Sequence, residues 1–148
     1  MSERSKQAET YFKEGYNCCQ AVVLAFADEV GLEKETALKI AASFGGGMGL
    51  LREVCGAVSG MFIVEGMKNG YTSPEDKEGK KAHYERIRAL AEKFREQNGS
   101  ILCKELLGLK EVPKDASPAD RNTQAYKKRP CAAIVECAAS IVEKESFL

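Results

Sequence analysis

The sequence predicts an all-α fold, a compact helical domain of six or seven helices. Apolar side chains recur at helical spacing in successive segments, and glycine or proline separates these segments. No segment alternates polar and apolar residues over a length that would indicate a β-strand. With 148 residues, the chain is long enough to bury a hydrophobic core without disulfides or metal, and we expect one domain over residues 1–148.

The first three expected helices end at glycine or at a glycine run. A surface helix over residues 2–14 is expected to end near Gly15. Asn17 is a suitable N-cap for the second helix, whose apolar stripe closes at Gly31. A third helix is expected over residues 33–44, where alanine, leucine and isoleucine side chains are available for burial.

A run of glycines at residues 45–49 follows the third helix. It resembles a dinucleotide-binding loop only superficially, because it follows a helix and not a strand. We therefore interpret it as a flexible loop or a tight connection between helices. The next helix is expected over about residues 54–68, with Gly56 and Gly60 on one face, where another backbone or a ligand can approach closely.

The second half of the chain predicts a long charged helix, a short helix, a polar segment and a final helix. The long helix covers about residues 74–98, and Ser100 is expected to cap a short helix that reaches Gly108. Residues 110–129 are polar and are interpreted as irregular, with one helical turn at most. Pro130 is well placed at the start of the last helix, because proline is favoured at the first helical position.

Charge and hydropathy exclude two classes of partner. Lys and Arg total 22, as do Asp and Glu, so the net charge is zero and nothing favours nucleic acid as a partner. The longest apolar run, residues 55–64, is about half the ~20 residues that a membrane-spanning helix needs. The N-terminal residues carry no apolar stretch typical of a signal peptide. We therefore expect a cytoplasmic protein that does not insert into membranes.

Cysteine is the unusual residue of the composition, with six in the chain. Because the cytosol keeps most thiols reduced, metal binding, catalysis or redox sensing is favoured over structural disulfides. The sequence contains no Cys-x-x-Cys motif, which excludes a thioredoxin-type pair and a local zinc knuckle. If the thiols act together, the fold must assemble them from distant positions.

Four of the six cysteines fall in the first turn of four expected helices: Cys18, Cys55, Cys103 and Cys131. Helix N-termini present unpaired N–H groups and a partial positive charge, and both favour the thiolate. If the four termini converge, they form a site suited to thiolates, a metal–thiolate centre or an iron–sulfur cluster.

The remaining candidates are better explained by packing. Cys19 shares a face with Val22 and Phe26, and Cys137 lies beside the apolar stripe of the last helix, so we expect both in the core. His83, the only histidine, is expected to be packed or hydrogen-bonded and not a ligand.

Five segments resemble the C-GCAxxG-C-C family, whose members are described as redox-active. They are Gly-Tyr-Asn-Cys-Cys-Gln-Ala-Val at 15–22, Phe-Gly-Gly-Gly-Met-Gly at 44–49, Cys-Gly-Ala-Val-Ser-Gly at 55–60, Gly-Ser-Ile-Leu-Cys-Lys-Glu-Leu-Leu-Gly at 99–108 and Cys-Ala-Ala-Ile-Val at 131–135. The resemblance places the four family cysteines on the four that begin the expected helices. Cys19 and Cys137 depart from the family pattern.

The resemblance implies thiol/disulfide redox chemistry carried by the four cysteines Cys18, Cys55, Cys103 and Cys131. The same residues are equally suited to the alternative of binding a metal, either zinc or an iron–sulfur cluster. A structural four-cysteine zinc site usually has short local spacings, which this sequence lacks, so disulfide exchange or a redox cluster is favoured. Because family members are often encoded near transporters, the partner expected is a transporter-associated or redox protein. In a third hypothesis the protein is a non-catalytic helical partner of a transporter.

Overall fold

The computed structural model describes residues 2–148 and confirms the all-α prediction. The structure contains long helices, three helices of four residues each, and a 3₁₀ turn, η1 (Ala42–Phe44). Within residues 2–148 the only β-type pairing is an isolated bridge between Val54 and Leu102. Six helices have eight residues or more: α1 (Glu3–Glu14), α2 (Cys18–Phe26), α3 (Lys34–Ala41), α5 (Gly56–Asn69), α6 (Lys77–Asn98) and α9 (Cys131–Phe147). The four-residue helices are α4 (Gly45–Met48), α7 (Cys103–Leu106) and α8 (Gln124–Lys127).

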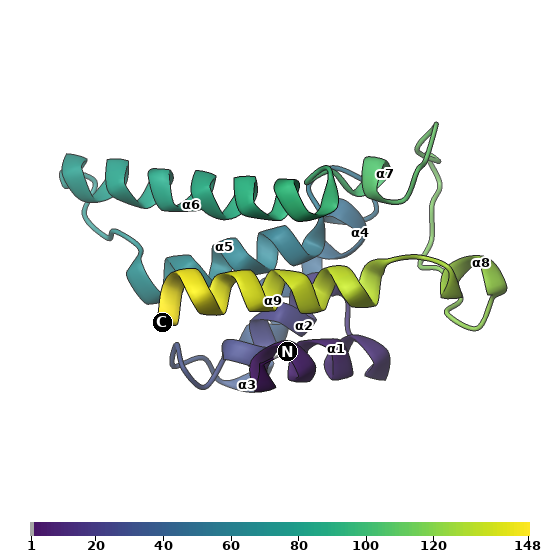
Figure 1. The fold of residues 1–148 in the computed structure, drawn as a ribbon, viewed down its shortest axis with the longest axis horizontal. Coiled ribbons are helices and arrows are strands. Elements are labelled where there is room, and N and C mark those ends of the chain that lie inside the picture. The colour runs from purple at the N-terminus through teal and green to yellow at the C-terminus, as the bar shows by residue number, and fades with distance from the viewer. Residues whose placement is uncertain (1) are drawn as a thin grey trace.

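The long helices form layers that run roughly along one another (Figure 1). Helix α6 lies along one side of the molecule, and α5 and α9 form the middle. Helices α1 to α3 cover the other side, where α1 packs against α9 and α2 packs against α5. The short helices α4 and α7 lie close together at one end, beside the first residues of α9 (Figure 1).

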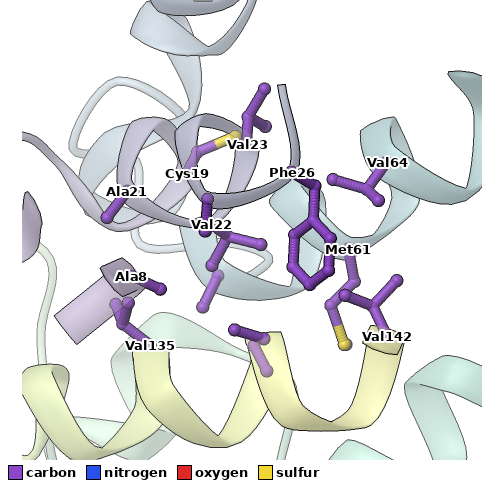
Figure 2. Close-up of a cluster of buried hydrophobic side chains, with 14 of the residues drawn as sticks. Ala8, Cys19, Ala21, Val22, Val23, Phe26, Met61, Val64, Val135 and Val142 are labelled. Atoms are coloured by element: carbon purple, nitrogen blue, oxygen red, sulfur yellow. The ribbon is translucent and has the colours of Figure 1, made fainter. Parts of the chain in front are cut away.

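The hydrophobic core lies between α2, α5 and α9 (Figure 2). Every residue from Ala21 to Phe26 is buried, so α2 is apolar on all sides, as expected of a helix enclosed by its neighbours. Helix α9 contributes Val135 and Val142, and α5 contributes Met61. Within residues 2–148, no helix has both the length and the hydropathy needed to span a bilayer.

The predicted cap of α2 is confirmed. The Asn17 side chain accepts a hydrogen bond from the backbone N–H of Gln20 at 2.8 Å, and the Gln20 side chain accepts one from the backbone N–H of Asn17 at 3.1 Å. This reciprocal capping box satisfies two N–H groups that the helix cannot pair internally. It sets Cys18 as the first residue of α2.

The predicted cap at Ser100 is wrong, since Leu102 is the N-cap of α7. Ser100 instead closes a local turn by accepting a hydrogen bond from the backbone N–H of Leu102 at 3.0 Å. Its hydroxyl also donates to the Glu105 carboxylate at 2.5 Å. The helix therefore begins at Cys103, which remains in its first turn as expected.

Two extended segments far apart in the sequence are joined by backbone hydrogen bonds, and we call this pairing the backbone clamp (residues 52–55 with 101–104). The N–H of Cys55 donates to the carbonyl of Ile101 at 2.8 Å, and the N–H of Cys103 donates to the carbonyl of Glu53 at 2.6 Å. The clamp fixes the starts of α5 and α7 next to each other.

Candidate functional site

The four cysteines predicted to begin helices all line one cavity of about 390 Å³. Cys18, Cys103 and Cys131 are the first residues of α2, α7 and α9, and Cys55 is the N-cap of α5. All four are free thiols. The structure therefore brings together, from four separate helices, the residues that the sequence singled out.

The glycine run forms a tight left-handed loop against this cavity. Gly47 has φ +68° and is buried, and a Cβ atom there would lie 2.6 Å from the Cβ of Cys103. The loop continues to Arg52, which also has positive φ, and hydrogen bonds from Arg52 N to Gly46 O (3.2 Å) and from Glu53 N to Gly47 O (2.9 Å) close it. A non-glycine residue in this conformation is strained and persists only where its surroundings hold it. The tight-connection interpretation of the glycine run agrees with this geometry.

Close contact between α2 and α5 places Cys18 beside Cys55. A Cβ atom at Gly56 would lie 2.8 Å from the Phe44 carbonyl oxygen and 3.2 Å from the Cβ of Cys18. These distances are shorter than side chains ordinarily tolerate, so only glycine lets the two helix starts approach this closely. The expectation of a close approach on the glycine face of α5 is confirmed.

Cys18 and Cys131 line the same cavity and shift each other's pKa in opposite directions. The side-chain interaction with Cys131, reinforced by burial, raises the pKa of Cys18 well above its ordinary value. The interaction with Cys18 and the charges of Arg129, Arg52 and Arg121 together lower the pKa of Cys131 to about 7, against the opposing effect of burial. Cys131 is therefore the thiolate of the pair, and Cys18 keeps its proton.

The expectation that all four helix starts favour a thiolate is wrong at Cys18 and Cys55. Burial raises the pKa of Cys55 to about 12, although the backbone N–H groups of Ala57 and Val58 act in the opposite direction. Desolvation of the charged sulfur outweighs the helix terminus at this position. At Cys18, the interaction with Cys131 and burial both raise the pKa and outweigh the helix terminus.

Three arginines of the cavity were not identified from the sequence. Arg52 is only 8% exposed, and its Nη1 donates to the sulfur of Cys103 at 3.6 Å. Arg121 donates to the carbonyl oxygens of Phe12 and Tyr16, and Arg129 directly precedes Pro130. Arg121 and Arg129 come from the segment interpreted as irregular. The only signal there was the position of Arg129, two residues before Cys131 at the helix start.

The other predicted candidates lie outside the cavity. Cys19 is fully buried in the core (Figure 2), and burial raises its pKa to about 12. Cys137 lies between α9 and α6, where its thiol donates to the Gln97 side chain at 3.1 Å. His83 packs edge-on against Tyr71 with ring centroids 6.1 Å apart. The packing interpretation agrees with the surroundings of Cys19 and His83, whereas Cys137 is half-buried at the edge of the core.

The metal alternative depends on how the possible ligands among residues 2–148 are arranged. No group of three or more His, Cys, Asp or Glu side chains in that range is arranged so that it could hold a metal ion. The four sulfurs share a cavity without forming a coordination shell, which for zinc would require Zn–S distances of about 2.3 Å to a common centre.

Comparison with known proteins identifies one family. A family model described as "Putative redox-active protein (C_GCAxxG_C_C)" matches residues 16–145, which is most of the chain. Neither the curated proteins nor the solved structures contain a match to the sequence.

Proposed function

The chain belongs to the C_GCAxxG_C_C family, and we propose that it exchanges electrons through a dithiol/disulfide pair formed by Cys18 and Cys131. The observation that carries this proposal is the cavity into which four helix starts bring four free cysteines, with Cys18 and Cys131 close enough to shift each other's pKa in opposite directions. A thiolate next to a protonated thiol is the arrangement that thiol–disulfide exchange requires, since one sulfur attacks and the second resolves.

Cys131 is the attacking group. Its thiolate attacks one sulfur of a substrate disulfide, which forms a mixed disulfide and releases the other substrate sulfur as a thiolate. The proton of Cys18 passes to that leaving thiolate, and the Cys18 sulfur then attacks the mixed disulfide at Cys131. The bond between the Cys131 sulfur and the substrate sulfur breaks, and this second substrate sulfur leaves as a thiolate that takes its proton from water. The products are a Cys18–Cys131 disulfide and two substrate thiol groups, so the two electrons come from the cysteine pair.

Cys55 and Cys103 form the second pair of the proposal. The backbone clamp holds these residues next to each other at the starts of α5 and α7. Because burial raises the pKa of Cys55 to about 12, Cys55 is a poor attacking group at neutral pH. We therefore assign the pair an auxiliary role, in which its two thiols return electrons to the Cys18–Cys131 disulfide by a second exchange.

Disulfide mapping tests the proposal. The reduced protein is titrated with a small-molecule disulfide, the remaining thiols are alkylated, and the linked peptides are identified by mass spectrometry without reduction. We expect a Cys18–Cys131 link to form first, and Cys131→Ser to abolish reaction with the disulfide. Cys137→Ser is the matched control, because Cys137 is half-buried like Cys131 but lies outside the cavity.

The alternative function, metal binding, is tested on the same purified protein. Protein purified without oxygen is analysed for bound metal and for visible absorption, which an iron–sulfur cluster produces and free thiols do not. Stoichiometric metal that is lost in each of the Cys18, Cys55, Cys103 and Cys131 serine variants would overturn the dithiol proposal.

A further inference from the structure

The lining of the cysteine cavity is strongly positive. Among residues 2–148, its side chains include Arg52, Arg121 and Arg129 but no aspartate or glutamate. The chain as a whole has a net charge of zero, so this concentration of one sign is local. A cleft lined by charges of one sign with low-dielectric walls attracts ligands of the opposite sign.

Arg52 is the least compensated of the three arginines. Only 8% of Arg52 is exposed, and its Nε has no hydrogen-bond partner in the part of the chain that the structure describes. Within that part, no carboxylate forms an ion pair with it. Burying an unpaired charge is costly, and in proteins such a charge is ordinarily matched by an anion.

The other two arginines are partly committed to the protein. Arg121 hydrogen-bonds to the carbonyls of Phe12 and Tyr16, and its guanidinium lies 4.2 Å from the Phe12 ring centroid. Arg129 lies 5.1 Å from the ring centroid of Tyr126. These contacts leave the positive charge in place but use part of the donor capacity of Arg121. Of the three, Arg52 is the one with a buried N–H group that lacks a partner among residues 2–148, although its Nη1 already donates to the sulfur of Cys103.

The cavity is larger and more apolar than a simple inorganic anion requires. Its volume of about 390 Å³ is within the ~300–1,000 Å³ of sites for small organic molecules. Its apolar lining comes from several elements: Phe12, Leu50, Leu106, Tyr126 and Ile134. A ligand that fits these walls has an apolar body and an acidic group.

We propose that the substrate is a small organic disulfide that carries acidic groups, with one acidic group bound by Arg52 and its sulfur–sulfur bond facing the Cys131 sulfur. This inference rests on the proposed dithiol function and specifies its substrate class. A carboxylate or another oxyacid supplies the negative charge that the buried Arg52 lacks, and its oxygens accept hydrogen bonds from a guanidinium. The reduction then follows the exchange given above, and the substrate leaves as two acidic thiols.

The alternative is that Arg52 serves only as a counter-charge to the cysteine thiolates. Its contact with the Cys103 sulfur and its electrostatic effect on Cys131 are consistent with that role. One thiolate, however, does not balance three guanidinium groups. Binding measurements that involve no thiol chemistry separate the two possibilities.

The first test uses suberate, in which two methylene groups replace the sulfur–sulfur bond of 3,3′-dithiodipropionate. We expect suberate, but not its neutral diamide, to bind the reduced protein in titration calorimetry. Arg52→Gln should weaken this binding about tenfold or more, because a hydrogen bond to a charged group is lost. Arg52→Lys should restore part of it, which would show that the charge and not the fold is responsible.

Arg88→Gln is the matched control, because Arg88 is an exposed arginine of α6 that does not line the cavity. Its affinity for suberate should equal that of the unmodified protein. If Arg52→Gln fails to fold, as judged by circular dichroism, Arg129→Gln tests the same charge requirement at a partly exposed position. Equal binding of suberate and its diamide, or no binding of either, would overturn the inference whatever the outcome for disulfide formation.

The second test compares 3,3′-dithiodipropionate with its diamide as oxidants of the protein thiols. We expect kcat/KM to be about tenfold or more higher for the dicarboxylate, and Arg52→Gln to remove this preference mainly through KM. Equal rates for both disulfides would overturn the inference and leave the dithiol function standing. If suberate binds through Arg52 but neither disulfide oxidises Cys18 and Cys131, the proposed function fails.

Discussion

Replacing Gly60 with alanine tests how closely α2 and α5 must approach. An alanine Cβ would lie 2.8 Å from the Cβ of Val22 and 3.2 Å from the carbonyl oxygen of Cys19. Both contacts are with parts of a buried helix and not with the end of a flexible side chain. The helices must therefore move apart, or the backbone of α5 must shift.

Gly66 provides a matched control in the same helix, because an added Cβ there meets nothing within 4 Å. Both substitutions gain the ~1 kcal/mol by which alanine is favoured over glycine in a helix. Overpacking of a core costs ~1–3 kcal/mol and applies only to Gly60→Ala. The difference between the two variants isolates the steric cost, so we expect Gly66→Ala to be more stable than Gly60→Ala by about 1–3 kcal/mol.

The measurement is urea unfolding of both variants, followed by circular dichroism at 222 nm with a thiol reductant present. For a chain of this size a change of 1 kcal/mol moves Tm by roughly 2–4 °C, so thermal unfolding gives a second estimate. Gly66→Ala should exceed the original protein in stability. If the two variants unfold at the same urea concentration, the close-packing argument for the glycine face is refuted.

Three further predictions concern the thiols. Alkylation of Cys131 should accelerate as the pH rises through about 7, because the thiolate is the reactive form. In Cys18→Ala this midpoint should move to higher pH, because the stabilising interaction with Cys18 is lost. An unchanged midpoint would contradict the pairing. Mild alkylation followed by mass spectrometry should label Cys18 well before the fully buried Cys19. Cys18→Ser should abolish disulfide formation, while Cys19→Ala should retain it. Labelling of Cys19 before Cys18 would argue against our placement of the helix start. Folding raises the pKa of Cys19 and Cys55 from 9.0 to about 12, so the unfolded chain loses these protons first. The free energy of unfolding should therefore fall as the pH rises from about 9 to 12. Urea titrations at several pH values should show a smaller fall in this free energy for Cys19→Ala.

The helices were predictable because their signals are local. Asn17 is the N-cap that was expected, and Gln20, three positions later, completes a capping box with it. Pro130 was expected at the first helical position and is instead the N-cap, one residue earlier. Boundaries that depend on tertiary contacts were less accurate. Helix α3 ends at Ala41 and continues as a 3₁₀ turn to Phe44, and α6 begins at Lys77 because Asp76 accepts a hydrogen bond from Gly79 N.

The candidate site was predictable in its cysteines but not in its electrostatics. Cys18, Cys55 and Cys131 each lie beside a residue typical of a helix start or a close approach, namely Asn17, Gly56 and Pro130. Cys103 was placed by a cap at Ser100 that the structure does not have. The pKa of each thiol depends instead on what lies across the cavity. Burial dominates at Cys55, whereas Cys131 responds to a thiol and three arginines from distant parts of the chain. The burial of Arg52 follows from a left-handed loop, and no sequence pattern used here indicates such a loop.

The backbone clamp links the integrity of the site to the opening of the molecule. Cys55 and Cys103 are 48 positions apart, and the chain between them includes all of α5 and α6. Their amide hydrogens are held in the hydrogen bonds to Ile101 and Glu53, so each exchanges with solvent only when the clamp opens. Both hydrogen bonds close the same loop, so the entropic cost of closing a loop of this length arises only once. The two amides should therefore exchange at a common rate, and that rate reports how often the starts of α5 and α7 separate.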